Sequence, residues 1–260
     1  MINWNTKTIG NPDDPVILFL HGFLGSLQDW LEISQKLASS YRCLLIDLPG
    51  HGSTTVTRRT DYSLSNTAES LMIYLINRGI KSCHLIGYSM GARLALFLAA
   101  KYPDFFYKVV MESVNPGLSN GVEKDLRVEQ DEILAREIES SPVDVFLRNW
   151  YSIPLFHSLR EHPNFEELVD RRENFSNTNW PNALRGMGLG RQPSLWNKLA
   201  SLQNEILILA GEKDKKFSKI AFRIQKYNKG FKIVSIKNCG HNVHFECQKE
   251  FLVEIKKFLK

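Results

Sequence analysis

The residues with the clearest chemical potential form the pentapeptide Gly87-Tyr88-Ser89-Met90-Gly91, which matches the pattern G-x-S-x-G. In this pattern a serine occupies a sharp turn between a strand and a helix, and small neighbours tolerate its strained backbone. A serine hydroxyl is a weak base and a weak nucleophile unless another group takes its proton. The motif therefore predicts a reactive serine at position 89 and requires a partner elsewhere in the chain.

Two later segments could supply that partner. In this arrangement an acid and then a histidine follow the serine along the chain, each after a later strand. Asp214 follows the apolar run "EILILAG", and His241 follows the run "FKIVSIKN". Asp214 would accept the Nδ1 proton of His241, fix its tautomer and stabilise its charged form. We expect the nearby Glu212 and His244 to make surface polar contacts or to pack within their loops.

The segment "FLHGFLGS" predicts a site for developing negative charge. His21-Gly22 allows a tight turn, so that the backbone N–H of Phe23 can point at an oxyanion. The N–H of Met90, at the start of the helix after the serine, would be the second donor. We expect His21 to be structural and to hydrogen-bond within its loop, and we interpret His51 of "LPGHGS" in the same way.

Short apolar runs alternate with helical patterns along the chain, and this alternation predicts what positions these groups. "PVILFLHG", "RCLLIDLPG", "SCHLIGYS", "YKVVMES", "EILILAG" and "FKIVSIKN" are typical of buried strands. Strands that alternate with helices indicate an α/β fold with a mostly parallel, doubly wound sheet. The opening "INWNTKTI" predicts an additional antiparallel edge strand.

One long segment interrupts the alternation. Between "YKVVMES" and "EILILAG" the sequence has helical patterns and no strand of the same kind. An insertion of this length after a strand favours a helical cap over a site rather than an unstructured loop. We therefore predict a core made of residues 1–116 and 202–260, with residues 117–201 as an inserted helical cap.

The charge distribution and the first residues of the chain indicate which partners are not expected. The chain has 260 residues and a net charge of +5, and its basic residues are spread along the sequence. We therefore expect no nucleic-acid binding. The first residues have neither a basic segment nor a long apolar one, so we expect no export signal and no membrane span.

The cysteines and histidines lack metal-site spacing. The four cysteines include no CxxC pair, and Cys43 and Cys83 start apolar strands, which favours buried free thiols. This cysteine usage fits a reduced, cytoplasmic protein. No HExxH pattern is present, so we expect no metal site.

With these residues in place, the sequence resembles the α/β-hydrolase superfamily over essentially its full length. "LHGFLGS", "DLPGHGS", "GYSMGAR", "GEKD" and "GH" follow one another in that family's order. "GYSMGAR", "ESVNPGL", "NWY" and "GRQPSLW" further resemble the 2-succinyl-6-hydroxy-2,4-cyclohexadiene-1-carboxylate synthases of menaquinone and phylloquinone biosynthesis. This resemblance implies a lyase that needs no cofactor and eliminates pyruvate from a small-molecule substrate with three carboxylates.

The resemblance also implies which cations bind that substrate. Arg93 lies one helical turn after Ser89 and would face the same cavity. Arg127 and Arg172 match the family's carboxylate-binding arginines, and a planar guanidinium suits a carboxylate better than an ammonium does. Arg191 is a further candidate.

Each of these arginines has a structural alternative. Glu123 or Asp131 could pair with Arg127 along one helix. Glu166 or Asp170 could neutralise the adjacent residues 171 and 172, and the sequence does not decide which of these two arginines would contact substrate.

Three aromatic residues, Tyr88, Trp150 and Tyr151, match the family's pocket lining. Tyr88 adjoins the serine, whereas Trp150 could instead serve only to pack its helix.

The expected role of Ser89 follows from the resemblance. With the help of His241, Ser89 would remove the proton alpha to the succinyl ketone, and no acyl-enzyme would form. The alternatives are a carboxylester or carbon–carbon bond hydrolase that uses Ser89 covalently, and a ligand receptor without enzymatic activity.

Overall fold

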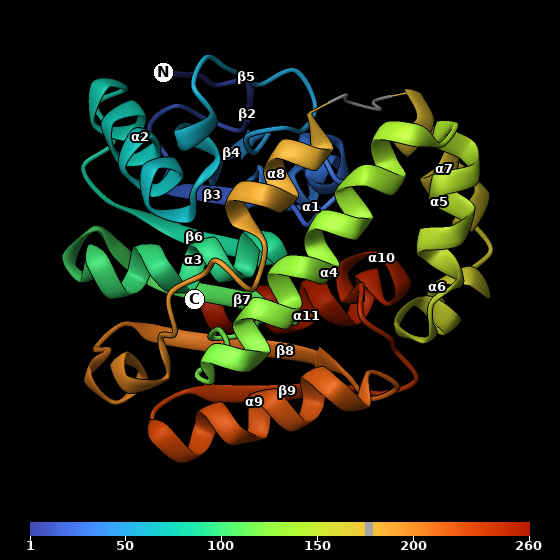
Figure 1. Ribbon diagram of the computed structural model, residues 1–260. Coiled ribbons are helices and arrows are strands. Elements are labelled where there is room, and N and C mark those ends of the chain that lie inside the picture. Colours follow the sequence, from blue (N-terminus) through green and yellow to red (C-terminus); the bar gives the residue numbers. More distant parts are fainter. Residues whose placement is uncertain (175–178) are drawn as a thin grey trace.

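The structure is a computed structural model of the chain and describes residues 1–174 and 179–260. A seven-stranded sheet with the order β2-β4-β3-β6-β7-β8-β9 forms its centre (Figure 1). All neighbouring strands are parallel except β2 and β4. The strands are β2 (Thr6–Ile9), β3 (Val16–Leu20), β4 (Arg42–Ile46), β6 (Cys83–Tyr88), β7 (Phe106–Glu112), β8 (Glu205–Gly211) and β9 (Lys232–Ile236). The predicted α/β-hydrolase sheet is confirmed.

The N-terminal segment contains the predicted antiparallel edge strand and one pairing that the sequence did not indicate. Strand β2 lies at the edge of the sheet, antiparallel to β4. The preceding β1 (Ile2–Asn3) pairs with β5 (Thr55–Val56) in a separate two-stranded sheet. The segment "INWNTKTI" is therefore divided between two sheets.

Helices cover both faces of the central sheet. Helices α2 (Leu64–Asn77), α3 (Met90–Lys101) and α9 (Lys215–Tyr227) contribute to the apolar cluster on one face. Helices α1 (Leu31–Leu37) and α11 (Gln248–Leu259) contribute to the cluster on the other face. Shorter elements connect them: η1 (Leu27–Trp30), η2 (Arg59–Tyr62), η3 (Pro103–Phe105) and α10 (Val243–Glu246).

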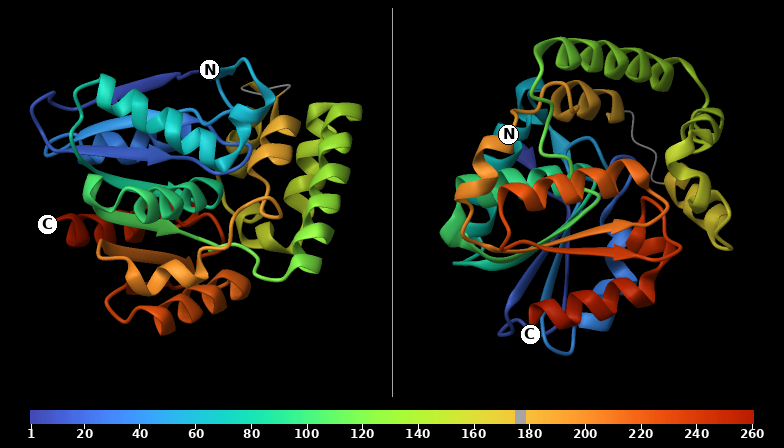
Figure 2. Two further views of the ribbon diagram at one scale, coloured as in Figure 1. Left: turned by 60° about the vertical axis from the view of Figure 1, so that its left-hand side comes forward. Right: turned by 90° about the horizontal axis from the view of Figure 1, so that it is seen from below.

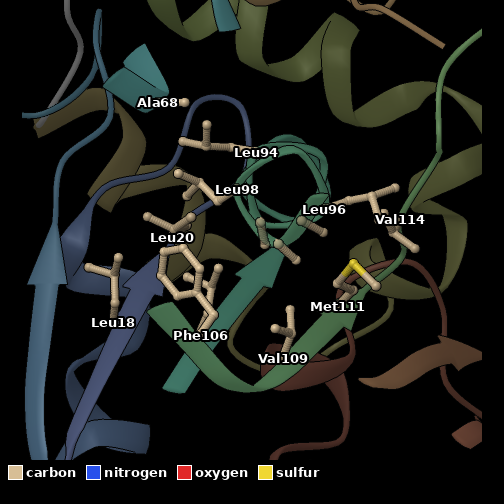
Figure 3. Packing of buried hydrophobic residues seen from close by; sticks show 14 of the residues in the cluster. Leu18, Leu20, Ala68, Leu94, Leu96, Leu98, Phe106, Val109, Met111 and Val114 are labelled. Atoms are coloured by element: carbon tan, nitrogen blue, oxygen red, sulfur yellow. The ribbon is translucent and has the colours of Figure 1, made fainter. Parts of the chain in front are cut away.

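The position of α3 matters most for the site. Its residues Leu94, Leu96 and Leu98 are fully buried, and Figure 3 shows them gathered with side chains of β3 and β7. The first turn of the helix touches the end of β3 so closely that a Cβ on Gly91 would lie 2.2 Å from the carbonyl oxygen of Leu20. Only glycine allows this approach, which fixes the start of α3 beside the loop that follows β3.

Between β7 and β8 the chain forms helices on one side of the sheet (Figure 2). The described residues between these strands contain no strand, as the sequence predicted. All of these helices except the last contribute to an apolar cluster of their own, which includes Leu147 and Trp180. The helices between the two strands are α4 (Gly121–Ser140), α5 (Val143–Ser152), η4 (Pro154–Phe156), α6 (His157–Arg160), α7 (Phe165–Asn174), α8 (Trp180–Met187) and η5 (Trp196–Ser201).

The limits of this cap remain a proposal. Trp196 and Leu199 of η5 belong to the main core cluster, together with Ile224 of α9. The last residues of the range 117–201 therefore pack with the core, while α4 to α8 form the part that covers the strand ends.

Two further expectations concern the chain as a whole. All four cysteines are free, and Cys43 and Cys83 are buried, as predicted. Within the described residues, no helix combines the length and the apolar character that a membrane span requires.

Candidate active site

Ser89 lies in the strained turn that the motif predicted. Its backbone angles are φ 49° and ψ −103°, a left-handed conformation that a residue with a side chain rarely adopts. Its N–H donates to the carbonyl oxygen of Glu112 at 2.9 Å, which ties the turn to the end of β7. The turn projects the hydroxyl towards His241, and Oγ lies 3.2 Å from Nε2 of that ring.

Asp214 uses its two carboxylate oxygens for different tasks. Oδ2 lies 2.6 Å from His241 Nδ1, and Oδ1 accepts a hydrogen bond from the N–H of Phe217 and thereby caps α9. The Oγ of Ser113 donates to the carbonyl oxygen of His241 at 2.8 Å. Asp214 and His241 are 5% and 2% exposed, so water does not compete strongly for these bonds. The serine, histidine and acid are thus joined in one chain of hydrogen bonds.

The loop after β3 is held by two buried histidines. The N–H of Leu48 donates to His21 Nε2 at 2.9 Å, and the N–H of Leu24 donates to His51 Nε2 at 3.1 Å. His21 Nδ1 bonds to the carbonyl oxygen of Gly22, so its expected bonding within the loop is confirmed. Burial lowers the pKa of both His21 and His51, which favours the neutral rings that these acceptor roles require.

The two predicted oxyanion donors lie at the same cavity. Phe23 and Met90 both line it, together with Ser89. Met90 is the first residue of α3, so its N–H has no acceptor within the helix. The next residue after Phe23, Leu24, has φ 63°, and its N–H is fixed by His51. The loop and the helix start are therefore rigid where donors to an oxyanion are needed.

The cavity above Ser89 has a volume of about 150 Å³. It lies between the strand ends and the cap, because its lining combines residues of both. Besides Phe23, Ser89, Met90 and His241, it is lined by Tyr88, Arg93, Ser113, Asn115, Arg127, Trp150, Leu155, Phe156, Ala183, Leu184, Met187, Gly188, Leu189, Lys216 and Phe217.

Arg93 is a half-buried cation with no ion-pair partner within 4.0 Å among the described residues. Its Nη1 donates to the carbonyl oxygen of Met187 at 2.8 Å and to Oε1 of Gln192 at 2.9 Å. Burial, with a further contribution from the nearby charge of Arg127, lowers the pKa of Arg93 to about 10. The attraction of the nearby Asp131 acts in the opposite direction but does not outweigh these two causes, so the charge of Arg93 is only partly compensated.

Arg127 has features of both roles that the sequence left open, a position at the cavity and an ion pair along its own helix. Its side chain lines the cavity, and its Nε also donates to Oδ1 of Asp131 at 2.8 Å across one helical turn of α4. Asp131 is buried and packs so closely against Gly188 that a Cβ there would lie 2.3 Å from Oδ2. Arg127 therefore reaches the cavity as half of an ion pair.

The other candidate arginines lie elsewhere. Arg172 is buried and binds Asp29 with two parallel hydrogen bonds, from Nη1 to Oδ1 at 2.7 Å and from Nη2 to Oδ2 at 2.9 Å. Arg171 lines a separate polar hollow beside Asp29, and Arg191 lines a surface groove between α4 and α8. The structure does not bring Arg172 to the cavity, and its predicted role in substrate binding stays a prediction.

Of the three predicted aromatic residues, two line the cavity and one does not. Tyr88 and Trp150 line the cavity, and the ring centroid of Trp150 lies 5.4 Å from that of Phe23. Tyr151 is buried outside the lining, where its hydroxyl accepts a long hydrogen bond of 3.4 Å from Arg172. Trp150 thus both packs in the cap cluster and faces the cavity.

His244 is not at the surface. It is 3% exposed, its Nδ1 lies 2.8 Å from Oε2 of the fully buried Glu112, and its backbone N–H donates to Oε1 of the same carboxylate. Trp30 stacks on its ring, with centroids 4.2 Å apart. The expectation of a surface contact was wrong for His244, because its partner Glu112 lies 132 residues earlier in the chain. Packing within its own loop, the alternative expectation, does not describe it either, because His244 lies in α10 and contacts Glu112 and Trp30 of distant elements.

Sequence reasoning missed several groups at the site. Gln192 orients Arg93, Ser113 holds the backbone of His241, and Lys216 lines the cavity. Gln192 and Ser113 occur in the motifs "GRQPSLW" and "ESVNPGL", so the motifs marked their segments without indicating their contacts. Lys216 follows Asp214 by two residues, and this proximity was the available signal. No group of three or more potential metal ligands occurs within the described ranges.

Comparison with known proteins places the chain in a family. The sequence pattern of the alpha/beta hydrolase fold matches residues 15–247. The putative 2-succinyl-6-hydroxy-2,4-cyclohexadiene-1-carboxylate synthase of Bacillus subtilis is 34% identical, over 94% of this chain and 89% of that protein. The chloroplastic protein PHYLLO of Arabidopsis thaliana is also 34% identical; the alignment covers 96% of this chain and 16% of that much longer protein.

A solved structure gives the same result in three dimensions. The structure of MenH from S. aureus superposes with a TM-score of 0.92 at 30% sequence identity, and the match covers 98% of this chain and 97% of that one. The chain therefore belongs to the α/β-hydrolase fold family and, within it, to the family of 2-succinyl-6-hydroxy-2,4-cyclohexadiene-1-carboxylate synthases.

Proposed function

We propose that this chain is a carbon–oxygen lyase of the kind its relatives are named for. It eliminates pyruvate from 2-succinyl-5-enolpyruvyl-6-hydroxy-3-cyclohexene-1-carboxylate and forms 2-succinyl-6-hydroxy-2,4-cyclohexadiene-1-carboxylate. We place this activity in the cytoplasm, on a free small-molecule substrate. The names of relatives at about 30–34% identity support the proposal, and so does the chemistry of the cavity.

The observation that carries the proposal is the charge of Arg93. Burying a guanidinium without a carboxylate is costly, and the lowered pKa of about 10 reflects that cost. Such a charge is expected where a ligand supplies the missing anion. A site for a neutral ester has no use for it, whereas a substrate with three carboxylates does.

Proton removal is the task of Ser89 and His241. As the Ser89 hydroxyl proton moves to His241 Nε2, the serine oxygen takes the proton from the ring carbon alpha to the succinyl ketone. The electrons of that C–H bond form an enolate. Asp214 holds Nδ1 of the ring and stabilises the cation that develops on His241.

Enolate collapse completes the elimination. The electrons return to form a ring double bond, the existing double bond shifts by one position, and the bond from ring carbon to enolpyruvyl oxygen breaks. His241 returns its proton to the leaving oxygen, and the released enol becomes pyruvate. No bond between Ser89 and substrate forms at any stage.

The enolate oxygen needs donors, and we assign this role to the N–H groups of Phe23 and Met90. Both lie at the cavity beside Ser89, on backbone that His51 and α3 hold rigid. Donors that are fixed in advance stabilise developing charge without reorganisation. We assign substrate contacts to Tyr88, Arg93, Arg127 and Trp150 because they line the same cavity.

The direct test is pyruvate release from the enolpyruvyl substrate, measured with a coupled lactate dehydrogenase assay. We expect turnover by the wild type and a loss of at least about a thousandfold in kcat for Ser89→Ala and for His241→Ala, because groups that act as a unit fail together. Wild-type protein that releases no pyruvate would refute the proposed function.

The same substrate separates the lyase from the hydrolase alternative. Deuterium at the carbon alpha to the succinyl ketone should slow turnover when proton transfer limits the rate. Rapid quench and intact-mass measurement should find unmodified protein. A stoichiometric adduct on Ser89 during steady turnover would instead support covalent catalysis by a hydrolase.

A further inference from the structure

The cationic side chains of the cavity are Arg93, Arg127 and Lys216. Lys216 lies on α9, outside the cap, and no sequence motif marked it. Within the part of the chain that the structure describes, the lining includes no aspartate or glutamate. The cavity is therefore bordered by positive charge from the elbow helix α3, from the cap helix α4 and from α9.

The three cations differ in how far other residues neutralise them. Arg127 shares its charge with Asp131 at 2.8 Å. Arg93 and Lys216 have no ion-pair partner within 4.0 Å in residues 1–174 and 179–260. By contrast, Arg172 is neutralised by Asp29 and lies outside the lining. Lys216 lines the cavity and has no ion-pair partner among the described residues, whereas Arg172 neither lines the cavity nor lacks such a partner. Lys216 is therefore the better candidate to bind an anion in the cavity.

The position of Lys216 suits a contact at the cavity opening. Its side chain is exposed, and Nζ lies 5.8 Å from the centroid of the Phe217 ring. The Phe217 ring in turn lies 4.5 Å from the ring of His241. The ammonium is therefore two ring contacts away from the catalytic histidine. When no substrate is bound, water solvates the ammonium group of Lys216. The flexible side chain allows the ammonium group to reach a carboxylate of a bound substrate.

We propose that Lys216 binds one carboxylate of the substrate at the opening of the cavity, as the third cation beside Arg93 and Arg127. This inference rests on the proposed function for the identity of the substrate. It makes Lys216 a specificity-determining residue, which acts on binding and on the capture of an anion rather than on proton transfer. Arg172, in the same account, stabilises the cap through Asp29.

Lys216→Gln tests the contact, and Lys215→Gln is its matched control. The two lysines are adjacent on α9, both are exposed, and both substitutions remove one charge. Lys215 lines a different hollow, beside Pro154 and Gly240. For Lys216→Gln we expect KM for the enolpyruvyl substrate to rise about fivefold with kcat nearly unchanged, as is typical of a charge at a rim. Lys215→Gln should keep the wild-type KM.

Ionic strength provides a second readout. The fall in kcat/KM with added salt should be weaker in Lys216→Gln than in the wild type, because one screened attraction is missing. Lys216→Arg should restore both KM and the salt dependence. Equal kinetics for the two glutamine variants, whether both impaired or both normal, would overturn the assignment.

A binding measurement that needs no turnover distinguishes failure of this inference from failure of the proposed function. Tricarballylate, a simple tricarboxylate, should raise the Tm of the wild type and of Lys215→Gln, and should do so less for Lys216→Gln. Acetate at the same ionic strength serves as the control anion. If the wild type releases no pyruvate but the Lys216 effect persists, the polyanion contact stands and the reaction is wrong. If tricarballylate affects Lys216→Gln and the control alike, the contact itself is wrong.

Discussion

Two arginines, the half-buried Arg93 and the buried Arg172, illustrate opposite uses of the same side chain. Arg93 lies at the cavity, and its hydrogen bonds among the described residues go to neutral acceptors, Met187 and Gln192. Arg172 lies in the seam between cap and core, where Asp29 accepts two parallel hydrogen bonds from it. One guanidinium keeps an only partly compensated charge that a ligand can use, and the other is fully committed to the fold.

The pKa values of the two arginines move in opposite directions because their partners differ. Burial alone would lower the pKa of both arginines, and it does lower that of Arg93 to about 10. At Arg172 the attraction and hydrogen bonds of Asp29 outweigh burial and raise the pKa further above its usual range. A buried charge is thus better evidence for a binding site when its partners are neutral than when they are acidic.

Breaking the ion pair should have the largest effect. Arg172→Met removes both short hydrogen bonds to the buried Asp29 and leaves it only the longer contact of 3.9 Å with Arg171, which should lower the free energy of unfolding by about 3–5 kcal/mol. Chemical denaturation followed by tryptophan fluorescence measures this. The double variant Asp29→Asn/Arg172→Met removes both charges and should recover a large part of the loss. If Arg172→Met unfolded like the wild type but bound substrate poorly, Arg172 would be a ligand of the substrate after all.

Removing Arg93 should lower the activity without lowering the stability. Arg93→Met should lower kcat/KM by about 30-fold to several thousandfold, equivalent to about 2–5 kcal/mol of lost charge-assisted binding. The free energy of unfolding should not fall, because burying this charge costs roughly 3 kcal/mol at pH 7 for a pKa lowered from 12.5 to about 10. Kinetics and denaturation on the same preparation check both parts. A loss of stability as large as that of Arg172→Met would contradict the contrast between the two residues.

Glu112 and His244 extend the comparison to a second buried pair beside the catalytic loop. Glu112→Gln keeps the shape but weakens the bonds that hold the loop with His241, so we expect about 1–3 kcal/mol of lost stability. We also expect kcat to fall more than KM rises, since the pair supports the catalytic groups. The Glu112 carbonyl oxygen accepts from the Ser89 N–H, and His244 contacts Tyr88 and adjoins the loop of His241. Steady-state kinetics and thermal unfolding provide the measurement. Unchanged kcat in a destabilised variant would limit the pair to a structural role.

The two arginine sites should change the stability in different pH ranges, with the smallest effects of the series: the Asp29 pair stabilises the fold, whereas the charge of Arg93 destabilises it. Burial would raise the pKa of Asp29, but Arg172 lowers it below 3.8 overall, so its stabilisation is present above pH 3.8 and is lost as pH falls through the lower folded value. At Arg93 the charged form is penalised in the fold, so stability is gained as pH rises above about 10. Difference curves of Tm against pH should both rise with pH: wild type minus Asp29→Asn in the acid range below about pH 3.8, and wild type minus Arg93→Met above about pH 10. If the two difference curves rose in the same pH range, the contrast between the two sites would be contradicted.

The sequence predicted the parts of the site that depend on chain order. Ser89, Asp214 and His241 follow parallel strands whose carboxyl ends meet at one edge of the sheet, so the motif and the strand pattern were sufficient to bring them together, although the last of these strands, β9, is a largely unburied edge strand. Arg93 followed from helical spacing after Ser89.

The remainder depends on contacts between distant segments. Asp29 meets Arg172 across 143 residues, and local helical spacing offered only the wrong acids as partners. The same limitation hid the pairing of His244 with Glu112. Lys216 was missed because its role depends on which side of α9 faces the cavity.

The double use of Asp214 has a consequence for how proteins of this fold can diverge. One oxygen caps α9 and the other holds His241. Asparagine caps helices about as well as aspartate, but its amide carries no charge to stabilise an imidazolium. A single base change in the codon could therefore silence the chemistry while the helix and the cavity persist. Descendants that bind polyanions without converting them are only one substitution away.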